Sequence, residues 1–372
     1  MTEQTDVFVI GGGPAGLAAA IAAKKRGFRV VVADGARWPI EKACGEGLMP
    51  DTLAALRELG VSIRATDGHL LRGVKFVGEH GEVEARFPAQ FAVGLRRVTL
   101  HARMVEAATN CGVELLWNTP VTGISADGVT LAGGDAPIFV RARWIVGADG
   151  IGSRVRMWSG LEASKQRDRR FAVRRHYRMP PWNEFVEIYW GNRAQAYVTP
   201  VGMNEISVVT ISGERVAKAV ELEDEFPRLA ERLRGAEVAG PERGAITMTQ
   251  KLRRVQRGNV ALVGDASGSV DAITGEGLAL GFRQAMALAE ALEAGNLAKY
   301  EAAHRRLVRR PALMGRLMLT LDGRPRLRER TIRALAMDAR LFGRLLAVHI
   351  GVKSEAHLAA TGAMLGWRLV GA

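Results

Sequence analysis

The stretch DVFVIGGGPAGLAAAIAAKKRGFRVVVAD, residues 6–34, decides the fold. DVFVI is a short apolar run, and such runs are typical of buried parallel strands. A glycine-rich turn follows, and then an alanine-rich segment with basic residues before a stop at Gly27, which predicts a helix. FRVVVAD predicts a second strand that ends at Asp34. Strand, turn, helix and strand in this order predict a Rossmann-like α/β fold.

The glycine turn has the spacing of a dinucleotide-binding site. Gly11, Gly13 and Gly16 occupy the positions of G-x-G-x-x-G. We expect Gly11 to make the tight turn, Gly13 to let the backbone approach a pyrophosphate, and Gly16 to let the helix pack on the strand. The helix begins with Pro14 and Ala15, and its N-terminus is expected to face the anion.

An acid at the end of the second strand narrows the choice of nucleotide. Asp34 lies about 20 residues after the turn, where an acid binds ribose hydroxyls. Such an acid disfavours a 2′-phosphate, so NADP is not expected at this turn, and FAD and NAD remain. The alternative is a glycine-rich turn that binds no ligand.

Two later segments repeat the pattern of a strand followed by glycines. WIVGADGIGSRVR runs into Asp149 and Gly150, and NVALVGDAS runs into Gly264 and Asp265. Asp265 therefore ends a strand at the edge where open sheets bind ligands. A long amphipathic helix is predicted from Gly275 onwards, in GEGLALGFRQAMALAEAL.

With these three motifs in this order, roughly residues 5 to 290 resemble an FAD-dependent group of enzymes. The group includes para-hydroxybenzoate-hydroxylase-like monooxygenases and geranylgeranyl-reductase-like enzymes. The resemblance implies that the first turn holds the ADP half of FAD and that Asp149 and Gly150 belong to a motif for FAD and NAD(P)H. It implies that Asp265, after Gly264, bonds the ribityl hydroxyls.

The predicted helix start suits the flavin end of such a cofactor. The free N–H groups and positive dipole end of a helix favour the negative charge of a reduced flavin near N1. Glycines there allow the backbone to approach the ring closely. The residues expected to do this are Gly275, Glu276, Gly277 and Leu278.

A further match supplies a phosphate ligand and an adenine contact. RRVTLHARMVEAATNCGVELLW resembles the R-x-x-[FL]-x-x-x-L helix of the family, whose arginine contacts the FAD phosphates. Arg97 takes that position, where it can bind two oxygens at the helix start, and Arg96 is the neighbouring alternative. Val121, in the predicted strand of NTPVTGIS, matches the residue that touches adenine through its backbone.

The segment EKACGEGLMP, residues 41–50, supplies the catalytic candidates. Cys44 and Gly45 match a pair that lies by the flavin in the reductase-like branch. A thiol there could donate a proton to a carbanion or shape the pocket, and the alternative is an inert packed thiol. Glu46 is the second candidate, because burial would raise its pKa and let it act as an acid or a base.

After residue 160 the sequence consists of short segments rich in strand-forming residues, separated by turn residues. They resemble an antiparallel sheet that forms the back wall of a substrate pocket. We therefore predict an FAD-binding domain of residues 1–70, 96–165 and 255–295, interwoven with a substrate-binding sheet domain of residues 71–95 and 166–254. The substrate-pocket candidates are His176, Tyr189, Gln195, Tyr197 and Thr199, each with packing inside the sheet as the alternative.

One strand bears on the choice of substrate. Prenyl reductases carry the pattern Y-x-W-x-F-P-x-G there, and AQAYVTPVG places Gln195, Tyr197 and Thr199 at its three aromatic positions. Glutamine and threonine make a more polar pocket than a tunnel for an isoprenoid chain, so the sequence argues against prenyl reduction.

Composition and charge bound the class of protein. The chain has 372 residues, 48% hydrophobic and 24% charged, which is ordinary for a globular protein. Its two cysteines form neither a disulfide framework nor a metal-binding spacing. The N-terminal apolar run is broken by glycines, and no apolar run of about 18 residues occurs, so we expect a cytoplasmic protein without signal peptide or membrane span.

The net charge of +13 raises the question of an anionic partner. The chain contains no zinc-finger or RNA-binding signature, so we expect no nucleic acid. Residues 296–372 form a predicted C-terminal helical region with a basic amphipathic pattern. These helices are expected to cover the FAD-binding domain, with pairing to a second subunit or contact with an anionic membrane surface as alternatives.

The sequence thus predicts an FAD-dependent oxidoreductase with a small, lipophilic substrate. Because one glycine-turn fold is visible, NAD(P)H is expected to bind transiently as the reductant. The favoured reaction is hydroxylation of a lipophilic aromatic or polyketide-like molecule, through a flavin C4a-hydroperoxide. The alternatives are an ene-reductase of the geranylgeranyl-reductase type and a flavoprotein that modifies a partner polypeptide.

Overall fold

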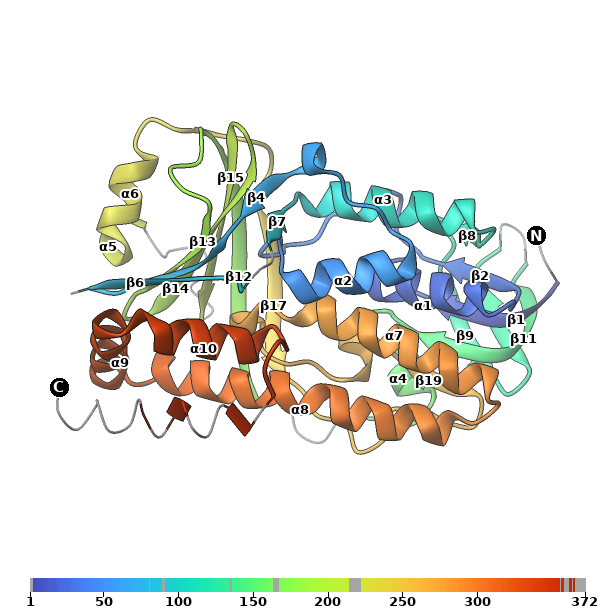
Figure 1. Cartoon of the computed structure of the whole chain (residues 1–372). Coiled ribbons are helices and arrows are strands. Elements are labelled where there is room, and N and C mark those ends of the chain that lie inside the picture. Colours follow the sequence, from blue (N-terminus) through green and yellow to red (C-terminus); the bar gives the residue numbers. More distant parts are fainter. Residues whose placement is uncertain are drawn as a thin grey trace.

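The computed structural model describes residues 3–79, 81–88, 91–133, 136–162, 167–213, 222–354, 356–357, 361–362 and 364. They form two large sheets side by side, with the N-terminus at the outer end of the first sheet and the last helices beside the second (Figure 1). The predicted α/β fold, with a Rossmann-like part, a largely antiparallel sheet and C-terminal helices, is confirmed.

The first sheet has a parallel centre. β1 (Gln4–Ile10) lies between β2 (Val30–Ala33) and β11 (Ile138–Gly147) and runs parallel to both. β8 (Glu114–Leu116) continues the sheet beyond β2, and β19 (Val260–Leu262) continues it beyond β11. The carboxyl ends of parallel strands share one edge, so the turns after β1, β11 and β19 meet there. The antiparallel members are β9 (Val121–Ser125), β10 (Gly128–Leu131) and β18 (Gln256–Arg257).

Small side chains let the helices pack closely on this sheet. α1 (Pro14–Lys25) is rich in alanine and packs against α7 (Gly277–Glu293), where Phe282 is fully buried. A Cβ at Gly16 would lie 1.8 Å from the carbonyl oxygen of Gly11, so only glycine fits this turn of the helix. The role predicted for Gly16, close packing, agrees with this geometry. The other helices here are α2 (Pro50–Leu59), α3 (Arg97–Asn110) and α4 (Arg154–Trp158).

The second sheet has the strand order β16-β12-β15-β14-β13-β5-β6, and β17 pairs with β12. Its neighbours are antiparallel except for β13 and β5, which run parallel. The expected antiparallel sheet therefore contains one parallel pair, because β5 enters from a distant part of the chain. The bounds are β5 (Gly73–Val77), β6 (Glu82–Arg86), β12 (Arg167–Arg178), β13 (Phe185–Trp190), β14 (Ala194–Gly202), β15 (Glu205–Ser212), β16 (Glu237–Val238) and β17 (Arg243–Thr249).

Helices cover both faces of the second sheet. Ile188 and Tyr197 belong to the face that packs against α9 (Pro325–Met337) and α10 (Ala339–His349). Tyr189 lies on the opposite face, because successive strand residues point to opposite sides. That face packs against α5 (Leu222–Glu225) and α6 (Pro227–Leu233).

A small third sheet joins the two halves. It consists of β3 (Gly47–Leu48), β7 (Ala92–Gly94) and β4 (His69–Leu71). A Cβ at Gly94 would lie 1.7 Å from the carbonyl oxygen of Pro200, so this glycine permits the contact with β14. The 3₁₀ turns are η1 (Ala65–Asp67), η2 (Gly264–Ser267) and η3 (Ala272–Thr274).

The C-terminal helices cover both halves rather than the FAD-binding part alone. α8 (Leu297–Asp322) packs its first turns on α7 and then runs along the molecule towards the second sheet (Figure 1). There Leu335, Phe342 and Leu346 of α9 and α10 bury the sheet face that bears Trp190. The expectation of a cover over the FAD-binding domain is thus correct only for the first part of α8.

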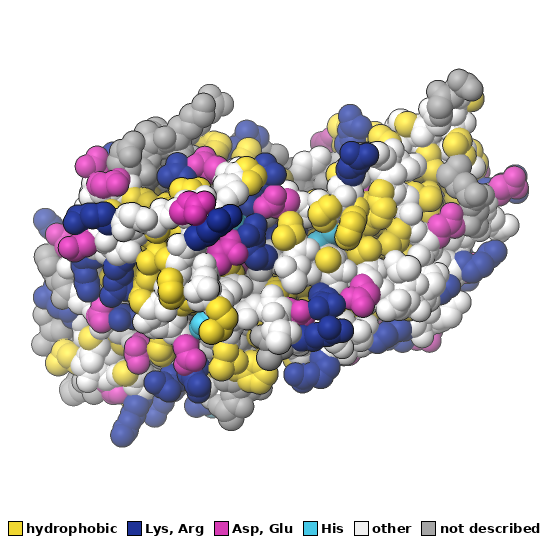
Figure 2. Space-filling model, turned by 90° about the horizontal axis from the view of Figure 1, so that it is seen from above, with side chains coloured by type: hydrophobic (Ala, Val, Ile, Leu, Met, Phe, Trp, Pro, Cys, Tyr) yellow, Lys and Arg dark blue, Asp and Glu magenta, His cyan; other side chains and the backbone are white. Residues whose placement is uncertain are grey.

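The basic net charge does not form a single patch on the face seen from above. On the face seen from above, Lys and Arg side chains are interspersed with Asp and Glu rather than gathered in one patch (Figure 2). Within the described ranges, every helix is too short or too polar to cross a membrane.

Candidate cofactor and substrate site

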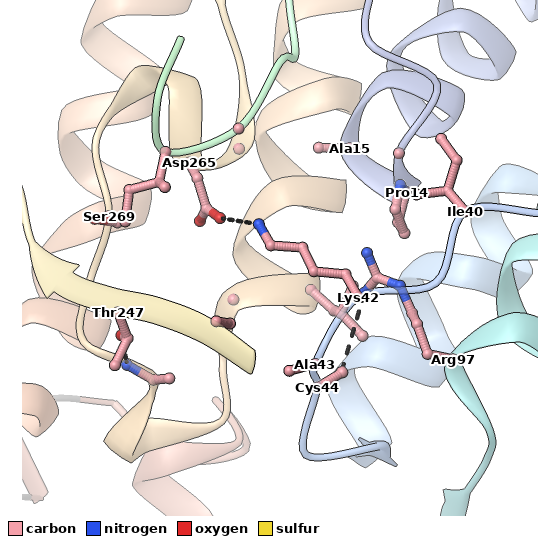
Figure 3. A pocket seen from close by; sticks show the side chains of 18 of the residues that line it. Pro14, Ala15, Ile40, Lys42, Ala43, Cys44, Arg97, Thr247, Asp265 and Ser269 are labelled. Atoms are coloured by element: carbon pink, nitrogen blue, oxygen red, sulfur yellow. Dashed lines mark hydrogen bonds and ion pairs between the residues drawn. The ribbon is translucent and has the colours of Figure 1, made fainter. Parts of the chain in front are cut away.

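A cavity of about 570 Å³ lies where the two sheets meet, a volume in the range of ligand sites. Its walls are the turns after β1, β11 and β19, the start of α7, the loop 41–47 and strands of the second sheet (Figure 3). The predicted site residues that line it are Gly11, Gly13, Pro14, Ala15, Asp34, Cys44, Glu46, Arg97, Val121, Asp149, Gly150, Tyr197, Thr199, Gly264, Asp265, Gly275, Gly277 and Leu278. Gly16, His176, Tyr189, Gln195 and Glu276 are not among its lining residues.

Two helices begin at this cavity with free backbone donors. The N-caps of α1 and α7, Gly13 and Glu276, make no side-chain capping bond. A Cβ at Gly13 or Gly277 would meet no atom within 4 Å, so these backbones border open space. Unpaired N–H groups and the positive dipole end attract anions. The arrangement fits a ligand with phosphates at α1 and a ring that carries negative charge at α7, as FAD does.

Arg97 supplies a cation beside the start of α1. It is the first residue of α3, and its backbone N–H donates to Glu46 Oε1 over 2.8 Å. Its buried Nε has no hydrogen-bond partner within the described part of the chain. Arg96, the alternative, instead pairs with Glu205 of β15. The Nε of Arg96 is unpaired as well, but Arg97 lines the cavity and Arg96 does not, so the geometry favours Arg97 as the phosphate contact.

Asp34 accepts a hydrogen bond from the glycine turn after β1. Its Oδ2 accepts from the N–H of Gly12 over 2.7 Å, and its Oδ1 accepts from the N–H of Ala36 over 2.7 Å. Both carboxylate oxygens retain further lone pairs towards the cavity that Asp34 lines. Val121 lies at the start of β9 and lines the same end of the cavity, next to Pro120. The ribose and adenine contacts remain predictions.

The second motif forms a helix-capping turn. Asp149 accepts from Ser153 Oγ and from the N–H groups of Arg154 and Val155, so its carboxylate fixes the start of α4. Gly150 has a φ of 80°, a conformation that glycine adopts without strain. The two residues line the cavity, and their contact with a cofactor stays a prediction.

Asp265 faces a lysine that the sequence analysis overlooked. Lys42 extends from the loop 41–47 across the cavity, and its Nζ lies 3.9 Å from Asp265 Oδ2 (Figure 3). Both side chains are about half exposed. Lys42 stands two positions before Cys44, in the segment already singled out, and this was the available signal. A cation there suits a phosphate or an electron-rich ring.

The turn of Asp265 is held from behind by α7 and α8. Gln284 Oε1 accepts from the N–H of Gly264 over 2.8 Å, and Ser267 Oγ lies 2.9 Å from His304 Nε2. Burial lowers the pKa of His304 to about 4, so the imidazole is neutral at neutral pH. No sequence pattern pointed to His304, because it lies on α8 and reaches the turn only through the tertiary fold.

Cys44 lies in the cavity wall and is a neighbour of Arg97. The N–H of Glu46 donates to its Sγ over 3.5 Å, and Arg97 Nη1 lies 4.0 Å from it. The other cysteine, Cys111, ends α3 and donates its S–H to the carbonyl of Ala108. Cys111 is thus placed as a packed residue, whereas the thiol of Cys44 faces the space where a ring is expected.

The expectation for Glu46 is wrong in one respect. Burial raises the pKa of this carboxyl, but the hydrogen bond from His176, the N–H of Arg97 and the charge of Arg174 outweigh it, so the pKa lies below its ordinary value. His176 Nε2 lies 2.6 Å from Glu46 Oε2, and Arg174 Nη1 lies 3.2 Å from Oε1. Glu46 is therefore an ionised anchor, not a proton donor, and its partners Arg174 and His176 are what the sequence could not reveal.

Three of the five substrate-pocket candidates also need correction. His176 is turned to Glu46, and Tyr189 lies on the far face of the sheet, where its hydroxyl donates to Glu187. Gln195 lies behind the wall, where it bonds Asp322. Strand alternation does not say which face meets the cavity, which decided the place of Tyr189, nor which part of that face borders it, which decided the places of His176 and Gln195.

Tyr197 and Thr199 do line the cavity. The hydroxyl of Tyr197 donates to the carbonyl of Ile273 over 2.9 Å, so the ring is fixed as part of the wall. Burial raises the pKa of this phenol, which keeps it protonated. The remaining wall of the second sheet is apolar, with Ala172, Val186, Val209, Ile211, Ala245 and Ile246.

Glu276 is placed differently from its glycine neighbours. Its carboxylate points away from the cavity, to Arg310 at 3.4 Å and His349 at 3.5 Å. Burial raises the pKa of this group. A contact with FAD through its side chain is therefore not available. Its backbone N–H donates to Thr274 Oγ1 over 3.4 Å, and a contact of this N–H with FAD stays a prediction.

A family model described as an FAD binding domain matches residues 4–307, which is most of the chain. The chain belongs to this FAD-binding family. It is thus an FAD-dependent oxidoreductase of the group that the three glycine motifs indicated.

The proteins that this chain is similar to include two reductases. Menaquinone reductase of Mycobacterium tuberculosis (strain ATCC 25618 / H37Rv) is 28% identical, over 80% of this chain and 78% of that protein. Digeranylgeranylglycerophospholipid reductase 1 of Methanopyrus kandleri is 30% identical, over 74% of this chain and 76% of that protein. The solved structure of a flavoprotein/dehydrogenase from Cytophaga hutchinsonii has a TM-score of 0.84 at 19% identity, covering 99% of this chain and 100% of that one, and this shows the shared fold.

The chain's own residues define what the flavoprotein can do with its cofactor. When bound, FAD supplies hydride and electron transfer at its ring. The N-terminus of α1 with Arg97 would hold the phosphates, and Asp265 would hold the ribityl chain. The N-terminus of α7 would favour negative charge on the ring. Tyr197 and the apolar strands would exclude water from the opposite side, and Cys44 lines the same space.

Proposed function

We propose that this flavoprotein is a reductase that saturates a carbon–carbon double bond of a lipophilic molecule, with NAD(P)H as the transient reductant. The observation that carries the proposal is the place of Cys44. Its thiol lines the same cavity as the start of α7 and the apolar wall of the second sheet. Saturating an alkene needs a hydride and a proton on adjacent carbons, and this cavity offers a flavin position and a proton donor together.

The changed position of Gln195 also bears on the choice of reaction. The sequence favoured hydroxylation because Gln195 and Thr199 predicted a polar pocket. Gln195 lies behind the wall and not in it, so the wall is more apolar than expected. Both relatives described above are reductases by name, one of menaquinone and the other of digeranylgeranylglycerophospholipid.

The proposal assigns a task to each group of residues. The apolar side chains Val186, Val209 and Ile211 bind the hydrocarbon part of the substrate by burial of apolar surface. Thr199 does not compete for it, because its hydroxyl donates to the carbonyl of Gly45 over 2.8 Å. Cys44 Sγ–H delivers the proton to the carbon that does not receive the hydride. Glu46 remains ionised and holds no transferable proton.

Hydroxylation of a compact aromatic molecule is the second candidate. It is favoured by Tyr197, whose ring is fixed by hydrogen bonds at the back of the cavity and shortens the space available to a chain. A wall of this kind suits a single ring system better than a long isoprenoid.

One anaerobic experiment separates the two reactions. The FAD-loaded protein is reduced, freed of oxygen and mixed with a prenylated hydroquinone, geranylgeraniol and a simple enone in turn, because a hydroquinone, unlike a quinone, can accept the hydride only at its alkene. Reoxidation of the flavin without oxygen, with a product two hydrogens heavier by mass spectrometry, is the expected result. The reductase proposal fails if no alkene reoxidises the flavin while oxygen yields a transient absorbing species and, with a phenol, a product heavier by one oxygen.

A further inference from the structure

The loop 41–47 carries the reactive part of the cavity wall but little structure of its own. Lys42, Cys44 and Gly45 face the cavity from this loop. Its regular structure is limited to the two-residue strand β3 at its end. Glu41 and Glu46 stand on either side of Lys42, Cys44 and Gly45 in the sequence. The position of the thiol therefore depends on what holds these two carboxylates.

A single buried arginine binds both carboxylates. Arg174 comes from β12 of the second sheet, and its side chain is 1% exposed. Its Nη2 lies 2.6 Å from Glu41 Oε1, and its Nη1 lies 3.2 Å from Glu46 Oε1. Guanidinium groups suit such bridges because their donors form a rigid, planar fork. A lysine in this position could satisfy one carboxylate fully but not both.

Further contacts fix each end of the loop. Glu46 also binds His176, the neighbour of Arg174 on the same face of β12, over 2.6 Å. Glu41 Oε2 lies 3.1 Å from Arg243 of β17. Two carboxylates thus face two permanently charged arginines, and the cluster is balanced in charge when His176 is neutral.

The loop 41–47 includes a residue in an unfavourable backbone conformation. Glu46 has a φ of 58°, a left-handed conformation that is unfavourable for a residue with a Cβ. The strain persists only while the surrounding contacts over-determine it. Removing one partner of a buried ion pair leaves an uncompensated charge, which is strongly destabilising locally. Loss of Arg174 should therefore release both ends of the loop.

We infer that Arg174 is a positioning residue that sets the loop 41–47, and with it the thiol of Cys44, at a fixed place in the cavity. The consequence for turnover rests on the proposed function, whereas the position of the loop does not. Arg174 acts through Glu41 and Glu46 and does not itself line the cavity.

The chain's two cysteines provide the test. The FAD-loaded protein and its Arg174→Gln variant are treated with iodoacetamide, and alkylation of Cys44 and Cys111 is followed by mass spectrometry. The matched control is Arg175→Gln, because Arg175 follows Arg174 on the strand but is half exposed and pairs with Glu242. We expect the rate at Cys44 to rise about tenfold or more in Arg174→Gln only, with no change at Cys111.

The outcomes are distinguishable. Equal acceleration at both cysteines means general loosening and overturns the inference, as does a Cys44 rate equal to that of Arg175→Gln. If Arg174→Gln does not fold, Glu41→Gln removes one partner of the same clamp and should accelerate Cys44 alone by a smaller factor. Arg174→Lys should restore part of the protection. If Arg174→Gln accelerates the alkylation of Cys44 alone but leaves turnover on alkenes undiminished, Arg174 does position the loop 41–47. The same result would contradict the proton-donor role proposed for Cys44.

Discussion

His304 gives a prediction that can be worked out from the structure. Its imidazole is buried beneath the turn of Asp265, where Nε2 lies 2.9 Å from Ser267 Oγ. The pKa of His304 falls from an ordinary value of 6.5 to about 4, because burial disfavours the charged form and Arg305 adds repulsion. At mildly acidic pH, His304 therefore binds a proton in the unfolded chain but not in the folded protein.

The sign and size of the effect follow from proton linkage. Stability from the neutral His304 is fully present above the unfolded pKa of 6.5 and is lost as the pH falls towards the folded pKa of about 4. At about pH 5 the loss amounts to about 2 kcal/mol, since each pKa unit corresponds to about 1.4 kcal/mol. His304→Gln keeps a hydrogen-bonding group at this position but cannot titrate. The variant therefore does not lose this part of the unfolding free energy when the pH falls.

The assay compares two proteins at two pH values. Urea unfolding of the wild type and of His304→Gln is measured with the same excess of FAD at about pH 7.5 and about pH 5. The stability advantage of the wild type should shrink by about 2 kcal/mol at the lower pH. His357→Gln, at an exposed histidine, is the control for loss of a histidine. An advantage that is equal at both pH values would refute the buried, neutral state of His304.

Three further changes test the site and the core. Asp265→Ala should weaken FAD binding about tenfold or more, as measured by titration of the apoprotein, because it removes hydrogen bonds to a charged acceptor; Asp127→Ala on the surface should not. Cys44→Ser should keep the FAD content but lower turnover about a hundredfold or more, and full turnover would exclude the thiol as proton donor. Phe282→Ala, at a fully buried position between α1 and α7, should lower the unfolding free energy by about 3–5 kcal/mol, and a loss below about 1 kcal/mol would contradict the packing of this core.

The nucleotide-binding end could be predicted from sequence because its determinants are local. Gly11 and Gly13 act through their backbone in one short turn, and Asp34 follows at the end of the next strand. Arg97 could be placed because it begins a helix whose start is visible in the sequence. Such features depend on spacing along the chain, and spacing is what a sequence displays.

The substrate side was predictable only in part. The resemblance to the pattern Y-x-W-x-F-P-x-G made Gln195, Tyr197 and Thr199 of β14 pocket candidates, but only the last two reach the cavity. Gln195 lies further along the strand, where Asp322 of α8 meets it. Which part of a strand borders a cavity depends on the elements packed over it, and these come from a distant part of the chain.

The charge state of Glu46 likewise depended on contacts that only the tertiary structure provides. From the sequence, Glu46 was a carboxyl whose burial raises its pKa. The tertiary structure places Arg174 and His176 beside it, and their combined effect reverses the direction of the shift. Burial is a property that composition and position can indicate, whereas the sign of a pKa shift depends on which charges lie within a few ångströms.

The sequence by itself determined the α/β fold, the order of the three glycine motifs and the FAD-binding class, since these rest on periodicity and on backbone conformations that particular residues require. The tertiary structure decided that Lys42 crosses the cavity, that His304 supports the turn of Asp265 and that Arg174 holds the loop of Cys44. Their partners lie far away in the chain, and only the tertiary packing brings the members of each pair within a few ångströms of each other.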